Sequence, residues 1–143
     1  MSVDHSQISV LAVKLKTMPL AMRSRLRPVV KAGAASIAAQ AKVNAAFSSR
    51  IPGAIYVRSY AGSDVTGASA TVGVSAAKAP HARVLEDGNV GSSSTTTFRH
   101  PVHGRDWWVT QDMHPFLGPA KASKERAITA EIAAAIETLG VGL

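Results

Sequence analysis

Cysteine is absent from the 143-residue sequence, and aromatic residues make up only 5% of it. The lack of cysteine excludes disulfides, thiolate metal sites and cysteine nucleophiles. No apolar run approaches the roughly 20 residues that span a bilayer, and the N-terminal residues lack the basic and then apolar layout of a signal peptide. We therefore expect a soluble protein, made in a cytoplasm, with no redox chemistry and no membrane partner.

Acidic residues are scarce in the N-terminal third. Residues 1–50 carry eight lysines and arginines against Asp4 alone, whereas residues 51–143 carry eight basic and eight acidic residues. The formal net charge of +7 therefore originates in the first 50 residues. Such a basic region suits a polyanion such as nucleic acid, and it equally suits an acidic protein surface.

The apolar inventory is thin, because much of the 46% hydrophobic content is alanine. A chain of this length is expected to form one domain over residues 1–143. A small core often depends on neighbouring subunits, since association buries surface that one domain cannot. The composition therefore favours an oligomer.

Two helices are predicted, one near each end of the chain. Apolar residues recur at three- and four-residue steps from about Pro19 to Phe47, where Pro28 either kinks one long helix or begins a second one. A second stripe, Ile128, Ile132 and Ile136, predicts a C-terminal helix that starts near Pro119.

Strands are predicted between the helices. Alternation from Ile55 to Tyr60 and again over residues 68–74, around a glycine-containing turn, predicts a β-hairpin. A second hairpin is predicted from residues 98–100 and 107–111. Residues 7–16 are expected to form a short helix, with an alternating strand as the alternative, and residues 81–86 either a helical turn or an edge strand. The Gly/Ser/Thr-rich residues 87–97 predict a mobile loop. The predicted class is α+β with a small antiparallel sheet.

One candidate binding surface lies on the first helix. On a continuous helix, Arg23, Arg27, Lys31 and Lys42 fall within about 100° of one another and would form a positive ridge. The ridge suits DNA phosphates or an acidic neighbour, and it is also what an ordinary solvated helix face looks like. No aromatic residue interleaves with these cations, so stacking on single strands is not indicated.

Candidate catalytic and metal sites are weak. His100 and His103 are three residues apart, but the intervening Pro101 argues against a helical pair and no carboxylate completes a zinc motif. Neither a Gly-x-Ser-x-Gly elbow nor a phosphate-binding glycine motif is present. We expect no enzyme activity, no cofactor and no metal.

The adjacent Trp107 and Trp108 are the strongest aromatic cluster. Adjacent strand residues point to opposite faces, so one indole can enter the core while the other is exposed, although both could be covered within the monomer. An exposed tryptophan beside Phe98 and Phe116 would be a good anchor for a partner subunit.

The order of several segments resembles the neck or tail-completion proteins of long-tailed phages, especially those of actinobacterial hosts. The resemblance covers nearly the whole chain and depends on these segments: the helical N-terminal half, Ile51-Pro52-Gly53, Ala82-Arg83-x-x-Glu86-x-Gly88, Phe98-Arg99-His100-Pro101-Val102-x-Gly104 and Pro115-Phe116-Leu117-x-Pro119-Ala120. The long loop at 87–97 departs from the pattern, which leaves the role of that segment open.

The resemblance implies a structural virion protein. It implies a ring, commonly of six subunits, at the head–tail junction between connector and tail proteins, with genomic DNA passing through its lumen. Glu86 and the Phe116-Leu117 pair would be structural marks of the family, and with Phe98, Trp107 and Trp108 they are candidate subunit-interface residues. A polar residue at Phe116 or Leu117 is expected to abolish assembly. The alternatives are a tail terminator that caps the tail tube and, from another class, a non-specific DNA-binding protein.

Overall fold

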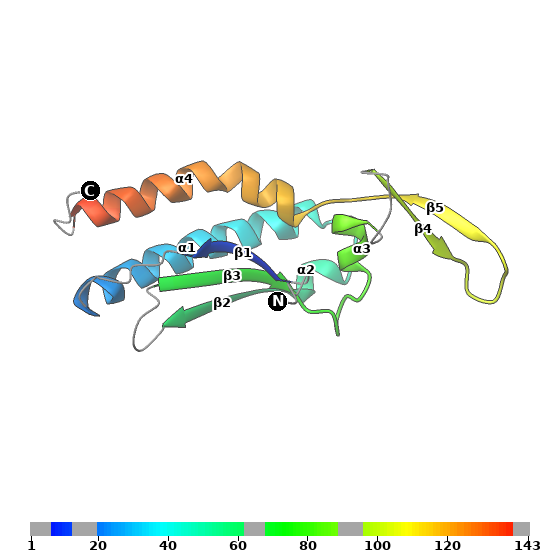
Figure 1. The fold of residues 1–143 in the computed structure, drawn as a ribbon, viewed down its shortest axis with the longest axis horizontal. Coiled ribbons are helices and arrows are strands. Elements are labelled where there is room, and N and C mark those ends of the chain that lie inside the picture. The colour runs from blue at the N-terminus through cyan, green and yellow to red at the C-terminus, as the bar shows by residue number, and fades with distance from the viewer. Residues whose placement is uncertain (1–6, 13–19, 62–67, 89–95, 139–143) are drawn as a thin grey trace.

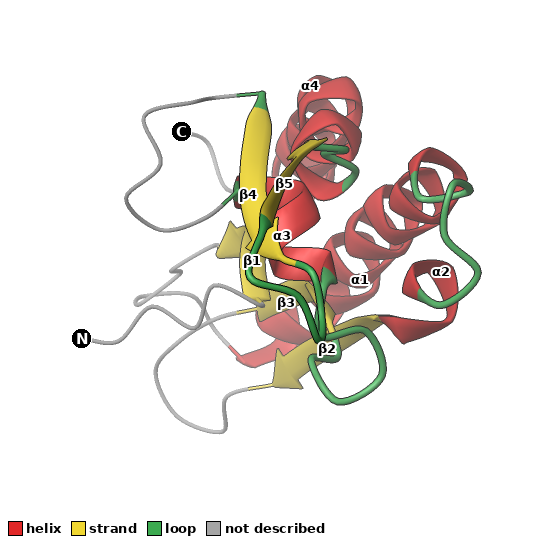
Figure 2. Ribbon diagram, turned by 90° about the vertical axis from the view of Figure 1, so that its right-hand side faces the viewer, coloured by secondary structure: helices red, strands yellow, loops and turns green. Residues whose placement is uncertain are grey.

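The computed structural model describes residues 7–12, 20–61, 68–88 and 96–138. Two long helices, α1 (Leu20–Asn44) and α4 (Leu117–Thr138), lie side by side, and α1 also packs against a small sheet (Figures 1 and 2). The α+β class, with a long N-terminal helix and a C-terminal helix, is confirmed. In α1 the helix continues through Pro28, so the alternative of two separate helices is wrong.

The sheet has three antiparallel strands in the order β1-β3-β2, formed by β1 (Gln7–Ala12), β2 (Ile55–Ala61) and β3 (Ala68–Val74). The predicted hairpin of β2 and β3 is confirmed, with Val57 opposite Val72 and Arg58 opposite Thr71. The helix expected over residues 7–16 is wrong for residues 7–12, which form a strand. That strand pairs with β3 and contains a bulge between Ser9 and Leu11.

The core lies between α1 and the two elements that pack against it, α4 and the three-stranded sheet. Val72 and Ile55 face α1 from the sheet, while Tyr56 and Arg58 lie on the other face, where the Arg58 guanidinium carbon stands 4.9 Å from the Tyr56 ring centre. Alternation along β2 therefore separates a buried face from an open one, as the sequence predicts.

Helices α1 and α4 approach each other closely at Gly33. A β-carbon there would lie 2.8 Å from Cγ2 of Ile128, a buried residue of α4. The side chain of Ile128 is β-branched and rigid, so it cannot move aside cheaply. Glycine thus sets the spacing of the two helices at this point.

Besides β2 and β3, the described chain between α1 and α4 forms two short helices and a second hairpin. The short helix α2 (Ile51–Ala54) leads into β2, and α3 (Ala82–Asp87) adopts the helical alternative expected for residues 81–86. The second predicted hairpin is confirmed as β4 (Thr97–Pro101) paired with β5 (Trp108–Asp112). Most of the loop predicted at 87–97 lies outside the described residues. In the part of the chain that the structure describes, no helix is long and apolar enough to cross a membrane.

Candidate functional site

Glu86 joins two of the sequence segments that carry the phage resemblance. Its Oε2 accepts hydrogen bonds from the backbone N–H groups of Phe116 (2.7 Å) and Leu117 (3.0 Å), and its Oε1 accepts one from Gly118 (2.7 Å). These donors belong to the first turn of α4 and the residue before it, where N–H groups lack partners within the helix. The carboxylate also lies at the positive end of the helix dipole. Glu86 therefore caps α4 from a segment 30 residues earlier in the sequence.

The glycine of the same motif is required by the backbone. Gly88 ends α3 with φ of 72°, in the region that side chains rarely adopt, and its N–H donates to the carbonyl of Val84 at 2.8 Å. A β-carbon at Gly88 would lie 3.0 Å from Sδ of Met113. The Glu86-x-Gly88 spacing thus places the capping carboxylate in the last turn of α3, and the glycine lets the chain turn where α3 ends.

Helix α1 also binds the start of α4, through Asn44. Asn44 Nδ2 donates to the carbonyl of Phe116 at 3.1 Å, and Gln40 Nε2 donates to Asn44 Oδ1 at 3.0 Å. Phe116 is fully buried and Leu117 is almost fully buried. The side chains of this pair are therefore covered within the chain and present no surface to a neighbour. Sequence reasoning missed Asn44, because nothing in its local pattern distinguishes it from other polar helix residues.

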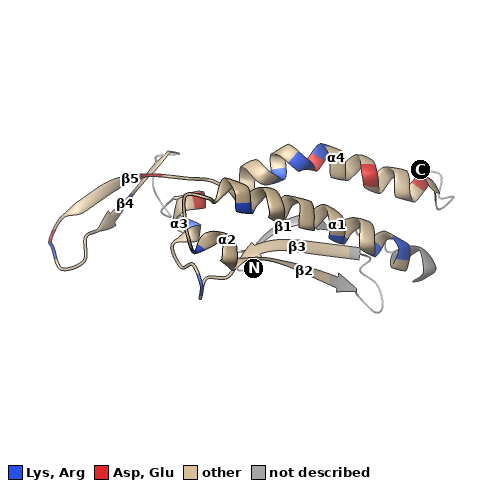
Figure 3. Cartoon of the chain, turned by 180° about the vertical axis from the view of Figure 1, so that it is seen from behind, with Lys and Arg blue, Asp and Glu red and all other residues tan. Residues whose placement is uncertain are grey.

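The described basic residues of α1 are open to solvent. Arg27, Lys31 and Lys42 are exposed, and α1 contains no acidic residue (Figure 3). Arg23 lies in α1 too, but its side chain is outside the described residues. By contrast, α4 carries both signs of charge. The helix is continuous, which is the condition under which these positions form one ridge.

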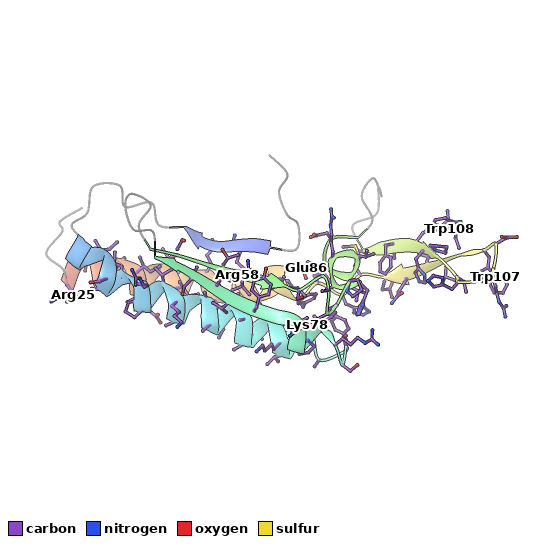
Figure 4. All side chains as sticks on the ribbon, turned by 90° about the horizontal axis from the view of Figure 1, so that it is seen from below. Arg25, Arg58, Lys78, Glu86, Trp107 and Trp108 are labelled. Atoms are coloured by element: carbon purple, nitrogen blue, oxygen red, sulfur yellow. The ribbon has the colours of Figure 1, made fainter. Side chains whose placement is uncertain are left out.

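The β4–β5 hairpin extends away from the helices as an arm, which we define as residues 97–112 (Figures 1 and 4). Trp107 and Trp108, near its far end, are 55% and 57% exposed. The expectation that at least one indole is covered within the chain is wrong, because neither face of this two-stranded sheet is covered over β5. The guanidinium carbon of Arg105 stands 4.9 Å from the Trp107 ring centre, and the Trp107 side chain remains exposed in spite of this contact.

Phe98 lies at the opposite end of the arm, its root. Its side chain is buried within the chain, with its ring centre 5.8 Å from that of His100. The hydrogen bond from Met113 N–H to the Thr96 carbonyl (2.7 Å) extends the hairpin pairing to the root, and the bond from His114 N–H to the Leu85 carbonyl (2.9 Å) joins the root to α3. The structure therefore separates Phe98 from the two tryptophans, which lie near the tip.

Two adjoining hollows of about 510 and 380 Å³ lie at this root and share His81, Leu85 and Gln111. We call them together the arm groove. Its apolar lining is Phe47, Val84, Leu85 and Phe98, and its polar lining includes Arg50, His81, Gln111 and His114. Phe47, which is 47% exposed, stacks on His114 with ring centres 4.9 Å apart.

Sequence reasoning did not predict the arm groove, since its lining comes from four separate segments. Among its apolar residues, the sequence marked Phe98 as an interface candidate and Phe47 as the end of a helical stripe, but it did not indicate that they share one groove. Of the two histidines considered as metal ligands, His100 lines the arm groove together with His81 and His114, whereas His103 lies in the exposed turn at the arm tip. Among the described residues, no three histidine or carboxylate side chains gather closely enough to hold a metal ion.

Comparison with known proteins gives no family for the chain. No family model matches it, and neither the curated proteins nor the solved structures contain a match.

Proposed function

We propose that the chain is a structural protein of a long-tailed phage virion, forming a ring at the head–tail junction that joins the capsid connector to the tail tube. The main supporting observation is the contact between the Glu86-x-Gly88 and Pro115–Ala120 segments, which carry much of the resemblance. The Glu86 carboxylate accepts hydrogen bonds from Phe116, Leu117 and Gly118, so the two segments depend on each other structurally. The role is mechanical, so the proposal includes no catalytic residue and no cofactor.

Two further features support an assembly role. The arm exposes both tryptophans without a covering layer, which is typical of a surface that a partner covers. The basic, acid-free α1 offers a surface for DNA passing through a lumen. Phosphate contacts of this kind stabilise a duplex without reading its sequence.

Imaging of assembled particles tests the proposal. We expect density for this chain in several symmetric copies between the head and the tail tube. A single copy, or density elsewhere in the particle, would overturn the proposal. Particles that lack the chain should contain complete heads and tails that are not joined. Tails of uncontrolled length would instead favour the tail terminator, because a protein that caps the tube ends its growth.

The exposed cations of α1 keep a second candidate, a non-specific DNA-binding protein, open. Arg27→Gln with Lys31→Gln removes two of them, and Lys124→Gln with Arg126→Gln is the matched control on α4. If α1 contacts DNA in a lumen, the α1 pair should leave ring assembly intact and impair DNA retention, whereas the control pair should not. If α1 binds an acidic neighbouring protein, the α1 pair should instead leave heads and tails separate.

Binding to DNA in solution separates the two candidates further. The isolated chain should bind duplex DNA weakly and without sequence preference, since its charges converge only in a ring. Each neutralised phosphate releases about 0.9 counterion, so any binding should fall steeply with salt. Tight binding to one duplex sequence would favour a regulator over a virion component.

A further inference from the structure

The arm lacks the support that a two-stranded sheet needs in water. All five residues of β5 are exposed, and within the described residues β5 pairs with β4 alone. An isolated hairpin of this kind is at best marginally stable, and three strands or a packed layer are usually required. Near its tip lies an apolar cluster of Trp107, Trp108 and Val109, each more than 40% exposed. The arm therefore has the properties of a segment that is covered in an assembly.

The arm groove has the complementary properties. Its hollows of about 510 and 380 Å³ fall within the range of roughly 300–1,000 Å³ typical of pockets that hold small organic groups. Phe47 and Leu85 offer apolar contact, and Gln111 and His81 offer acceptors within the same lining. An indole needs both, because its ring is apolar and its N–H requires an acceptor when buried.

We propose that the arm of one copy inserts Trp107 and Trp108 into the arm groove of the next copy. Trp107 and Trp108 lie toward the free end of the arm (Figure 4), whereas the groove is lined by residues at its root, so one chain cannot fill its own groove. Because the two surfaces differ, the contact is head-to-tail, and its repetition closes a ring when the rotation between copies fits. The inference deepens the proposed virion ring and rests on it for the ring's place in a particle, but the contact itself can be tested alone.

Charge favours a second copy over nucleic acid as the occupant. The arm carries Arg99 and Arg105 against Asp106 and Asp112, which gives it a formal charge of zero. A neutral arm can approach its own basic chain without repulsion, and it offers a polyanion no net attraction.

The absence of cysteine makes the contact directly testable. His103→Cys places a thiol in the exposed arm tip, and Ser49→Cys places one on the groove lining, with both substitutions at exposed positions. A disulfide forms only when the two α-carbons come within about 7 Å. Mixing the two full-length single-cysteine chains under mild oxidation should therefore give a covalent dimer, and a chain that carries both changes should give a ladder that ends at the ring size.

Three comparisons define the specificity of this cross-link. His103→Cys mixed with Glu131→Cys, an exposed position on α4, should give only background cross-linking. Adding Trp107→Ser and Trp108→Ser to the His103→Cys chain should raise the dissociation constant of its complex with the Ser49→Cys chain at least about 30-fold, as expected for loss of a hot-spot aromatic. Val43→Ser, which removes an exposed apolar side chain of α1, should leave the cross-link unchanged.

Three results would overturn the inference. The first is a cross-link between two His103→Cys chains alone, which would indicate an arm-to-arm contact. The second is equal yield with the Glu131→Cys partner. The third is no cross-link in concentrated protein or in assembled rings. Rings without the disulfide would refute the arm contact and leave the proposed function standing, whereas a specific ladder from a protein absent from virions would refute the proposed function and leave the contact standing.

Discussion

Replacing Glu86 by alanine should destabilise the protein substantially, because one side chain satisfies three backbone donors at the start of α4. The donor of Gly118 is exposed and can turn to water, whereas Phe116 and Leu117 are buried residues. Removing a capping side chain typically costs about 1 kcal/mol, a hydrogen bond to a charged group contributes about 1.5–3 kcal/mol, and a carboxylate at a helix N-terminus adds about 0.3–1 kcal/mol. Since these contributions overlap, we expect Glu86→Ala to lower the free energy of unfolding by about 2–4 kcal/mol.

Glu86→Gln separates the charge from the shape of the side chain. Glutamine retains one acceptor oxygen but turns an amide group toward the remaining donors, so the expected loss is about half that of alanine, or about 1–2 kcal/mol. Glu131→Ala, an exposed substitution on the same helix, is the matched control and should change stability by less than about 0.5 kcal/mol.

Equilibrium unfolding in urea, followed by far-ultraviolet circular dichroism, measures these differences. The midpoint should fall in the order control, glutamine, alanine, while the denaturant slope stays constant, since the surface exposed on unfolding does not change. If Glu86→Ala matched the control, water would be capping α4 as well as the carboxylate does. The Glu86 carboxylate would then not be required to cap α4.

Three further substitutions test the packing of the body and the independence of the arm. Gly33→Ala should cost about 1–3 kcal/mol by overpacking against Ile128, in spite of the better helix propensity of alanine, and combining it with Ile128→Ala should restore part of that loss in a double-mutant cycle of urea unfolding. Phe116→Ala should cost about 3–5 kcal/mol because the ring is fully buried, and a midpoint near that of the wild type would contradict its place in the core. Trp107→Ser with Trp108→Ser should change the free energy of unfolding of the unassociated chain by less than about 1 kcal/mol, since both indoles are exposed; a larger loss would mean that they support the fold itself.

The elements that the sequence predicted correctly are those whose signals are local. Alternation over residues 55–60 with glycines beyond the strand produces the β2–β3 hairpin, because both the pairing and the turn lie within twenty residues. The Ile128, Ile132 and Ile136 stripe likewise needs only one neighbouring helix to become buried. Each of these patterns marks an element that is apolar on one side, and it can be recognised without knowing which element packs there.

Two of the errors share a different cause. Residues 7–12 form a strand because β3 supplies partners more than fifty residues away, and a six-residue alternation cannot indicate whether such an edge is available. The exposure of both tryptophans follows from the absence of a layer on either face of the arm, which strand periodicity cannot reveal. Glu86 is intermediate: the sequence order marked its motif as structural, but its bonds to Phe116 and Leu117 span about thirty residues and have no local signature.

The arrangement of these bonds connects the stability of the body to the geometry of the arm. Leu85, whose carbonyl accepts from His114 N–H at the arm root, directly precedes Glu86, whose carboxylate holds the first turn of α4. The short helix α3 therefore contacts the arm root and the C-terminal helix at adjacent residues, and Leu85 also lines the arm groove. A contact that must repeat around a ring requires a fixed angle between the inserting arm and the receiving groove, since small errors accumulate from one copy to the next. The Glu86 cap joins α3 to α4, so in the ring proposed above it would also fix the angle at which the arm leaves the body.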